Sequence, residues 1–414
     1  MELTNVHNAL KIILNHTENY GVEEVVFADS LGRVLKEEIF ADRDFPPFNR
    51  VSMDGIAISH NSFVNGQSAY KIEGVQAAGS EQLTLNDTTN CIEVMTGAML
   101  PLNCDVVIPY EQIVIENKIA SIVIEELIFY KNIHRKGSDK NKGDLLISKN
   151  TMISSAEIGV LATVGKVTVA VAKNPRVMIV STGDELVEVS QTPKEFQIRR
   201  SNVHTLVSLL KRKQIQADTA HITDDKEALK QKINEFLDSY DVLLFSGAVS
   251  KGKFDFIPEV LDELGVEKLF HKVAQRPGKP FWFGGTATSI ISEQDVNQDV
   301  KKSKTIVFAF PGNPISTFVS CVKYFYPWFD KSLGIESTNQ NLAILANDIT
   351  FNPSMTYFVQ VKLENKNGSM YAIPIVGNGS GDLASLVEGD AFLELPADKK
   401  EFKKGEVFPV IKYR

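Results

Sequence analysis

Two kinds of segment alternate in the middle of the chain, and this alternation limits the possible folds more than any other feature. Val177–Val180 and Val242–Phe245 are continuous apolar runs. Val203–Leu210 lies between them and repeats its apolar residues at helical spacing, with Ser201 or Asn202 as the expected N-cap. Strands without polar positions are typical of a sheet that is covered on both faces, and their alternation with helices predicts a mostly parallel sheet.

Further segments of the same two kinds complete this predicted α/β domain, which we place at residues 173–330. The additional segments are the strands Ala217–Ile222 and Thr305–Phe310 and the helices Lys226–Leu237, Ile257–Leu264 and Ile315–Phe329. A polar stretch from Ser292 to Lys304 is expected to be an exposed loop within the domain.

The segments on either side predict further domains, so the expected fold class is multidomain α/β plus β. Apolar residues at helical spacing indicate a first helix from Val6 to Leu14, with Thr4 or Asn5 as its N-cap. A second helical patch near residues 155–165 could pack back on it, which would make the β-type region between them an insertion. We predict an N-terminal helical and linker domain at residues 1–50 and 144–172, an inserted β domain at 51–143, and a C-terminal β-barrel-like domain at 331–414.

The expected strands of the two β domains are short apolar runs between Asn, Gly and Pro turns. They are Cys91–Met95, Val106–Ile108, Ile113–Ile115 and Ile122–Ile124 in the insertion, and Tyr357–Leu363, Tyr371–Ile375, Ala391–Leu395 and Val407–Ile411 near the C-terminus.

Composition and charge exclude several function classes. The net charge of −8 argues against a nucleic-acid surface, which needs a basic field. No apolar run approaches the roughly 20 residues of a membrane helix, and the N-terminus does not resemble a secretory signal. The 3 cysteines have no metal-ligand spacing and are expected to be buried thiols. A cytoplasmic protein is therefore expected.

Three loops follow apolar runs of the predicted sheet, at the edge where ligands bind in open α/β sheets. Hydroxyls, glycines and helix-start residues in these loops are suited to anions, and the carboxylates are suited to Mg²⁺. The candidates are Ser181, Thr182, Gly183, Asp184 and Glu185 in the first loop, Ser246, Gly247, Ser250 and Asp255 in the second, and Pro311, Gly312, Asn313, Pro314 and Ser316 in the third. Taken alone, the first loop also reads as an ordinary turn with capping acids, and the third as a helix cap.

A cationic segment lies between the second and third loops. Lys272, Arg276 and Lys279 fall within eight residues, and Pro277, Gly278 and Pro280 restrict the backbone around them. A run of charge is usually a solvated face, but this one is bracketed by apolar residues and rigid turns, so we interpret it as an anion site. Neither a Walker A motif nor a GxGxxG motif is present, which removes the main support for kinase and NAD readings.

These loops occur in the order found in molybdopterin-binding α/β domains. The loops after the strands and Pro277-Gly278-Lys279-Pro280 carry this resemblance. The other parts of the chain add further motifs: Ser52-Met53-Asp54-Gly55, Thr96-Gly97-Ala98 with Leu100-Pro101, Arg135–Asp139 with Lys142-Gly143-Asp144, and Gly377–Leu383. Together the motifs cover nearly the whole chain, which resembles the molybdopterin molybdenumtransferase family, including the E domain of gephyrin.

The resemblance implies an activity, partners and site residues. Such enzymes take molybdate and adenylylated molybdopterin, release AMP and use Mg²⁺ or a similar ion, and they form homodimers whose sites lie between subunits. Contacts with molybdopterin adenylyltransferase and with molybdoenzyme apoproteins are further expectations. The implied metal ligands are Asp184, Glu185 and Asp255. The implied catalytic residues are Asp54, Asp139, Glu185, Asp255, Lys272 and Lys279, with Thr96, Arg276 and Ser380 joining the loop residues in binding substrate.

Some positions depart from the family pattern. Met355 stands where the family usually has Arg, Gln360 where a basic residue is frequent, and Arg276 where Lys is common. Two alternatives remain at this point: a molybdopterin adenylyltransferase, which shares the α/β domain, and a scaffold that keeps the fold without the chemistry. The length of the flanking domains argues against the first. Met355 is the best argument for the second, whereas the retained acids and Lys279 argue against it.

Overall fold

The computed structural model describes residues 3–247, 249, 255–286, 304–336 and 340–414. The chain divides into two compact units, which are considered separately below. One unit comprises residues 1–36, 150–154 and 170–414, and the other comprises residues 37–149 and 155–169. The boundaries of the four predicted domains remain a prediction. Residues 292–303 of the polar stretch expected as a loop lie outside the described residues.

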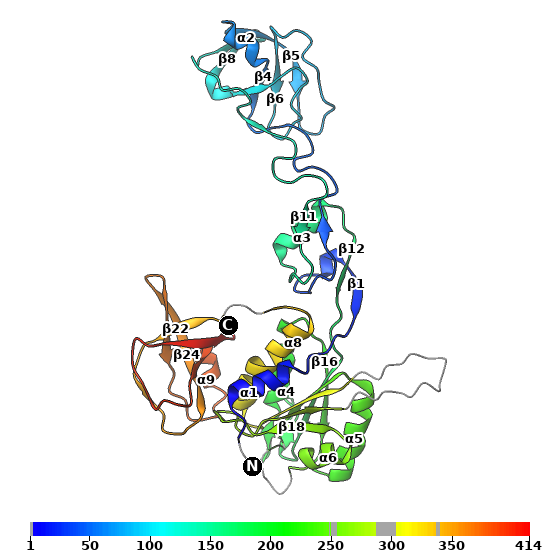
Figure 1. The fold of residues 1–414 in the computed structure, drawn as a ribbon, viewed down its shortest axis with the longest axis vertical. Coiled ribbons are helices and arrows are strands. Elements are labelled where there is room, and N and C mark those ends of the chain that lie inside the picture. Colours follow the sequence, from blue (N-terminus) through cyan, green and yellow to red (C-terminus); the bar gives the residue numbers. More distant parts are fainter. Residues whose placement is uncertain (1–2, 248, 250–254, 287–303, 337–339) are drawn as a thin grey trace, which may run out of the picture. The chain divides into compact units, whose positions relative to one another are not determined.

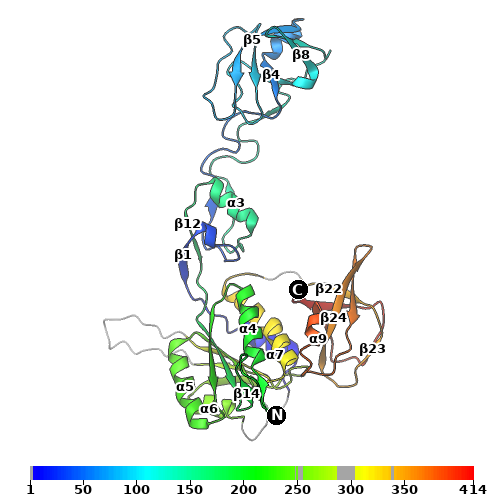
Figure 2. The same cartoon turned by 180° about the vertical axis from the view of Figure 1, so that it is seen from behind.

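A six-stranded sheet forms the centre of the first unit (Figures 1 and 2). Its strand order is β16-β13-β17-β21-β20-β18. The strands are β13 (Val177–Thr182), β16 (Ala217–Ile222), β17 (Val242–Ser246), β18 (Glu267–His271), β20 (Trp282–Gly285) and β21 (Ile306–Phe310). β13 pairs in parallel with β16 and β17, and β17 with β21, whereas β20 runs antiparallel to both of its neighbours. The predicted mostly parallel sheet is confirmed, with β20 as its antiparallel strand and β18 at the edge in the same direction as the others.

Both faces of this sheet are buried, as the continuous apolar runs predicted. Val177 and Ile179 of β13 belong to one hydrophobic core, and Met178 and Val180 belong to the other. The first core is covered by α1 (Val6–Leu14), α4 (Ser201–Arg212), α7 (Pro314–Ser320) and α8 (Tyr326–Ser332). The second core is covered by α5 (Lys226–Ser239) and α6 (Ile257–Glu263), and Figure 1 shows these two helices together on one side of the sheet.

Two expectations about helices need correction. The segment from Ile315 to Phe329 is not one uninterrupted α-helix, because the π-helical segment Cys321–Phe325 (η3) separates α7 from α8. α4 begins at Ser201 after Arg200, so Ser201 and Asn202 lie in its first turn and neither is its cap. α1 contacts α8, and α3 (Ser155–Thr163) belongs to the other unit, so the expected packing of the second helical patch on α1 stays a prediction.

A closed β-barrel follows in the same unit, as the sequence predicted. Its strands are β22 (Leu342–Leu345), β24 (Thr356–Lys366), β25 (Ser369–Pro374), β26 (Ala391–Leu395) and β28 (Val407–Lys412). They follow one another in the order β24-β25-β22-β28-β26, and the pairing of β26 with β24 closes the ring. Alternate strand residues fill the interior, among them Val361, Leu393 and Val410.

The second unit contains a six-stranded sheet in the order β7-β4-β6-β5-β9-β8. The strands are β4 (Gly55–Ile58), β5 (Ala69–Gln76), β6 (Cys91–Val94), β7 (Val106–Pro109), β8 (Ile113–Glu116) and β9 (Ile119–Ile122). β9 begins three residues before the expected strand Ile122–Ile124 and overlaps it at Ile122. A short helix, α2 (His60–Val64), interrupts the predicted β region. Alternate residues of β4 enter two cores, so both faces of this sheet are buried too.

The remaining elements are short. They are β1 (Val22–Val26), η1 (Phe27–Asp29), β2 (Ile39–Phe40), β3 (Arg50–Val51), η2 (Tyr110–Gln112), β10 (Ile133–His134), β11 (Leu145–Ile147), β12 (Thr168–Ala172), β14 (Leu186–Val187), β15 (Ile198–Arg199), β19 (Gln275–Arg276), β23 (Ile349–Thr350), α9 (Ser385–Glu388) and β27 (Glu401–Phe402).

All three cysteines are buried free thiols, as expected. Burial raises the pKa of Cys91 and of Cys104 to about 12, so both thiols are protonated at neutral pH. Within the described parts of the chain, no helix combines the length and the apolar character that crossing a membrane requires.

Candidate functional site

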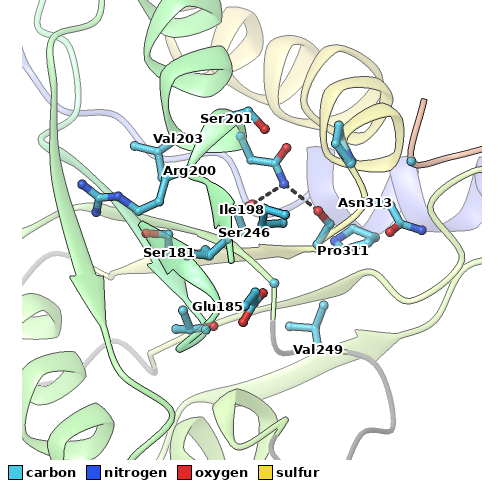
Figure 3. Close-up of a pocket in the computed structure, with 18 of the residues that line it drawn as sticks. Ser181, Glu185, Ile198, Arg200, Ser201, Val203, Ser246, Val249, Pro311 and Asn313 are labelled. Carbon is cyan, nitrogen blue, oxygen red and sulfur yellow. Dashed lines mark hydrogen bonds between the residues drawn. The ribbon is translucent and has the colours of Figure 1, made fainter. Parts of the chain in front are cut away.

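A cavity of about 630 Å³ opens at the carboxyl ends of β13, β17 and β21. After β13 the chain continues to β16 on one side of that strand and then returns to β17 on its other side. Such a reversal of strand order leaves a crevice between the strand ends, where ligands bind in open α/β sheets. Figure 3 shows Ser181, Ser246 and Pro311, one from the end of each strand, around this cavity.

The first predicted loop is partly strand. Ser181 and Thr182 are the last residues of β13, and the Ser181 hydroxyl lies 3.0 Å from Nδ1 of His221. The Thr182 hydroxyl is buried and has no hydrogen-bond partner among the described residues. Gly183 has φ +129°, and a Cβ there would lie 2.5 Å from Oε2 of Glu185. The positive φ favours glycine at this turn, and the Glu185 carboxylate lies beside it.

Asn202 joins the second and third loops. Its side-chain amide Nδ2 donates to Ser246 Oγ at 3.0 Å and to the carbonyl oxygen of Gly312 at 2.6 Å. The backbone N–H of Gly247 donates to the carbonyl oxygen of Phe310 at 3.1 Å, so this predicted anion donor is already used within the sheet edge. The sequence missed Asn202 because a short polar residue before an apolar helix reads as a cap. Of the second loop, Ser250 lies outside the described residues.

The third loop starts a helix and also contacts the barrel region. Asn313 precedes α7, and Pro314 is its first residue, as predicted. The Asn313 side chain makes no cap hydrogen bond; it donates to Ser380 Oγ at 2.7 Å, and the N–H of Ile315 donates to the Ser380 carbonyl oxygen at 3.1 Å. The Thr317 hydroxyl donates to the carbonyl oxygen of Pro311 at 2.5 Å. The bonds from Asn313 and Ile315 thus link the third loop to Ser380, which lies 67 residues after Asn313.

Four carboxylates gather at the sheet edge, one more than the sequence suggested. Burial, followed by repulsion from Asp184, raises the pKa of Asp224, and Glu185 and Asp255 add to the repulsion. The backbone N–H of Asp224 also donates to Asp184 Oδ1 at 3.2 Å. Asp224 follows β16. The sequence analysis did not identify it, because the next residue, Asp225, caps α5 and the acidic pair therefore reads as the start of a helix. Hard oxygen donors that repel one another fit a divalent cation, yet in the described residues no three such side chains are assembled around a metal position.

A second cavity of about 390 Å³ adjoins the first and shares Pro280, Pro311 and Asn313 with it. Arg276 and Lys279 line it, and both are exposed. β19, which includes Arg276, pairs in parallel with the start of β24 and so attaches the cationic loop to the barrel. Lys272 lines neither cavity. Two of the three predicted cations, Arg276 and Lys279, therefore line the second cavity.

The second unit holds Asp54, which accepts two hydrogen bonds from one residue. The Thr96 backbone N–H and hydroxyl approach Asp54 Oδ1 at 2.6 and 2.7 Å. These bonds, the backbone one first, lower the pKa of Asp54 and keep it ionised. A Cβ on Gly55 would lie 1.9 Å from the carbonyl oxygen of Ile108, so only glycine fits beside Asp54. The motif that contains Asp54 and the motif that contains Thr96 are thus joined by these hydrogen bonds.

Asp139 is the end of a second polar chain in this unit. His134 Nε2 lies 2.7 Å from Asp139 Oδ1, and Arg50 Nη2 lies 3.0 Å from His134 Nδ1. A guanidinium can only donate, so Nδ1 accepts and Nε2 carries the proton that His134 donates to Asp139. The sequence analysis identified Asp139 but neither of the other two.

Comparisons with known proteins cover the whole length of the chain. Residues 4–165 match the "MoeA N-terminal region (domain I and II)" family, residues 178–331 the "Probable molybdopterin binding domain" and residues 343–413 the "MoeA C-terminal region (domain IV)". The molybdopterin molybdenumtransferase of Synechocystis is 39% identical over 410 residues, which are 98% of this chain and 99% of that protein. The chain belongs to the molybdopterin molybdenumtransferase family. A relative of the same name from Staphylococcus epidermidis is 29% identical over 98% of this chain and 94% of that protein.

Solved structures agree with this assignment to a transferase family. Two crystal structures of the molybdopterin biosynthesis moeA protein of Pyrococcus horikoshii cover 100% of this chain and of their own. They have TM-scores of 0.82 and 0.78 at 25% and 28% identity. The predicted family and fold class are confirmed.

Apart from Lys272, which lines neither cavity, and Ser250, which lies outside the described residues, the predicted site residues of this member of the molybdenumtransferase family form three groups, and their roles stay predictions. Those that line the first cavity are Ser181, Thr182, Gly183, Glu185, Ser246, Gly247, Asp255, Pro311, Gly312, Asn313 and Pro314. Those that line the second are Arg276, Pro277, Gly278, Lys279, Ser316 and Ser380, together with Pro311 and Asn313. Those in the other unit are Asp54, Thr96 and Asp139. Asp184 is joined to the first group through Asp224.

Proposed function

We propose that this chain transfers molybdenum from molybdate into adenylylated molybdopterin and releases AMP. The observation that carries the proposal is the pair of adjoining cavities at the carboxyl edge of the sheet. The first is bordered by hydroxyls, by carboxylates and by Arg199 and Arg200, whereas the second is bordered by Arg276 and Lys279 and its described lining contains no carboxylate. A nucleotide-linked substrate and a small oxyanion need neighbouring sites of these two kinds.

In this proposal the first cavity binds the phosphorylated pterin and its adenylate. Ser181, Thr182 and Ser246 supply hydroxyls, and the buried Thr182 hydroxyl is the best placed of them, because it has no partner among the described residues. A buried polar group without a partner is costly, so a substrate oxygen that accepts this hydrogen bond would gain from it. Asn202 keeps the second and third loops together during binding.

The carboxylates of Asp184, Glu185 and Asp255 would hold Mg²⁺, and Asp224 joins them as a fourth candidate. A divalent ion bound there would offset the negative charge of the phosphoanhydride as its bond to AMP breaks. Burial raises the pKa of Asp224 most, and repulsion from Asp184, Glu185 and Asp255 adds to it, so a divalent ion would relieve this repulsion.

The second cavity is the proposed place for molybdate. Arg276 offers a planar guanidinium that can bind two oxygens, and Lys279 offers a point charge. Ser316 and Ser380 add hydroxyls at the same cavity. Lys272, which lines neither cavity, would act at longer range if it takes part.

Asp54 and Asp139 are the proposed base or water-positioning groups. The hydrogen bonds from Thr96 keep Asp54 ionised, as a base must be. His134 orients the Asp139 carboxylate. Because such residues act from the second unit, we also propose a homodimer in the cytoplasm, with molybdopterin adenylyltransferase and molybdoenzyme apoproteins as further partners. Light scattering that gives only a species of one chain mass, 45.9 kDa, would contradict the dimer.

The decisive experiment measures AMP release from adenylylated molybdopterin. We expect release that depends on molybdate and on a divalent cation, together with formation of molybdenum cofactor. A protein that binds the substrate but releases no AMP at saturating molybdate would be a scaffold, and the proposed activity would be wrong.

A further inference from the structure

A buried chain of hydrogen bonds contacts the cationic loop, the segment from Lys272 to Pro280. Gln275 and Tyr324 are both fully buried, with 0% of either residue exposed. The Tyr324 hydroxyl donates to Gln275 Oε1, and Gln275 Nε2 donates to the carbonyl oxygen of Pro277 at 3.0 Å. A carbonyl oxygen only accepts, so the bond to Pro277 settles which end of the Gln275 amide is which.

The π-helical segment η3 places Tyr324 in this chain. A π segment adds a residue to a helical turn and changes the direction of the side chains on it, and such segments are frequent at functional sites. The Tyr324 ring also packs against Phe281, with 5.0 Å between ring centroids. Burial, helped by Glu394, raises the pKa of Tyr324 far above its usual value, so its hydroxyl remains a donor.

The same amide also fills the space under Gly278. This glycine has φ +94°, and a Cβ there would lie 2.6 Å from Gln275 Nε2 and 3.0 Å from Ser320 Oγ. Gln275 therefore bonds the loop at Pro277 and contacts it at Gly278. Arg276 and Lys279, which line the second cavity, flank these two positions. The backbone that carries these two cations is therefore in contact with Gln275 at two adjacent positions.

We propose that Gln275 and Tyr324 are positioning residues of the second cavity: their buried hydrogen bonds hold Arg276 and Lys279 at the spacing that one tetrahedral oxyanion requires. Neither side chain has to touch the oxyanion. This inference rests on the proposed function, because it takes the second cavity as the molybdate site.

The test compares two Tyr→Phe variants of consecutive helical segments. Tyr324→Phe removes the hydroxyl that holds Gln275. Tyr326→Phe is the matched control, because its hydroxyl also donates to one oxygen, the Leu209 carbonyl at 2.9 Å, but Leu209 lies in α4 and neither belongs to the cationic loop nor lines the second cavity. Tyr324→Phe loses a buried hydrogen bond, and Tyr326→Phe loses a part-buried one. Molybdate is titrated calorimetrically into each full-length protein, and the unfolding temperature and the steady-state constants for molybdate are measured.

We expect Tyr324→Phe to weaken molybdate binding about threefold to tenfold, the effect of one lost hydrogen bond. KM for molybdate should rise by a similar factor, whereas kcat should change little. Tyr326→Phe should lower the unfolding temperature without changing either constant. Equal molybdate affinity in the two variants would overturn the positioning role.

A double variant separates positioning from stability. Tyr324→Phe leaves Gln275 Oε1 buried without a donor. Gln275→Met in the same protein removes that oxygen and should return part of the stability, although the Pro277 carbonyl oxygen then loses its donor as well. Molybdate affinity should remain low, because the hydrogen bond from Gln275 to Pro277 is then also missing. Recovery of both properties in the double variant would reduce the pair to an ordinary part of the core and refute the inference.

Lys279→Ala distinguishes failure of this inference from failure of the proposed function. If Lys279→Ala weakens molybdate binding but Tyr324→Phe does not, only the positioning role is wrong. If Lys279→Ala also leaves binding unchanged, the second cavity is not the molybdate site, and both ideas fall together.

Discussion

Asn202 offers the sharpest test of how the first cavity is held together. Its amide is the link between Ser246, at the end of β17, and Gly312, in the loop after β21. Asn202→Asp keeps the shape of the side chain and replaces the donating NH₂ by an oxygen. The Ser246 hydroxyl can rotate and donate to that oxygen, but the Gly312 carbonyl only accepts. A carboxylate 2.6 Å from this carbonyl would be repelled, so the two loops should move apart.

The structure allows the size of this effect to be worked out. The variant loses one hydrogen bond, worth about 0.5–1.5 kcal/mol net. The Gly312 carbonyl is exposed, so water can replace the lost donor, and any further cost comes from repulsion between the new carboxylate and this carbonyl. We therefore expect a stability loss of about 1–2 kcal/mol, with Asn202→Ala near the lower end because it brings no charge. Displacing binding groups by about 1 Å can slow an enzyme about a hundredfold, so AMP release should fall by about ten- to a hundredfold.

Thr205→Val is the matched control, because among the described residues the Thr205 hydroxyl bonds to the carbonyl oxygen of Ser201 in the same helix and to nothing else. AMP release is followed at sub-saturating adenylylated molybdopterin, and unfolding is followed by circular dichroism. We expect Thr205→Val to behave like the parent protein. Full activity and an unchanged unfolding temperature in Asn202→Asp would refute the reasoning, because the loops would then not depend on this amide.

Three other predictions follow from the candidate site. Asp255→Asn should fold normally but release AMP much more slowly, and unchanged turnover at saturating Mg²⁺ would remove Asp255 from the proposed metal site. Lys279→Ala should raise the molybdate requirement about ten- to a hundredfold, from the loss of about 1.5–3 kcal/mol, with Arg276→Ala as its companion; parent-like conversion by both would exclude a cationic oxyanion site. The hydrogen bonds from Thr96 lower the pKa of Asp54 below 3.8, so their stabilising contribution is complete above that pH and is lost as the pH falls through the lowered pKa. Thr96→Val should therefore destabilise the protein at pH 6 more than at pH 2.5 in thermal unfolding, and an equal loss at both pH values would contradict this linkage.

The sheet and its loops could be predicted because each signal is local. Continuous apolar runs require burial on both faces, and β13 indeed divides its side chains between two cores. The loops that follow such strands must meet at one edge of a parallel sheet, so Ser181, Ser246 and Pro311 border one cavity. The strands β18 and β20 were not foreseen, and β20 runs antiparallel to the rest of the sheet. β20 (Trp282–Gly285) has two glycines among its four residues, and its burial comes from neighbours that the local pattern does not reveal.

The side chains that the sequence missed have a different property: each acts on a distant segment. The amide of Asn202 reaches a carbonyl 110 residues away, and the hydroxyl of Tyr324 reaches an amide 49 residues away. The local sequence pattern predicts hydrogen bonds between a polar side chain and the backbone near it, so Asn202 was interpreted as a helix cap. The acidic pair Asp224 and Asp225 shows the limit most clearly, because the second residue does cap a helix while the first lines the cavity.

The same reasoning bears on Met355, the departure that favoured a scaffold. Met355 packs against the hydrophobic core of the barrel and also lines the second cavity, where it brings no charge. The cations at this cavity, Arg276 and Lys279, come instead from a loop that the Gln275 amide holds from below. An oxyanion site depends on where its positive charges are fixed more than on their number, because a preorganised charge loses less entropy on binding. A neutral residue at position 355 is therefore compatible with the proposed chemistry as long as the cationic loop, which accepts the hydrogen bond from Gln275, keeps its two cations in place.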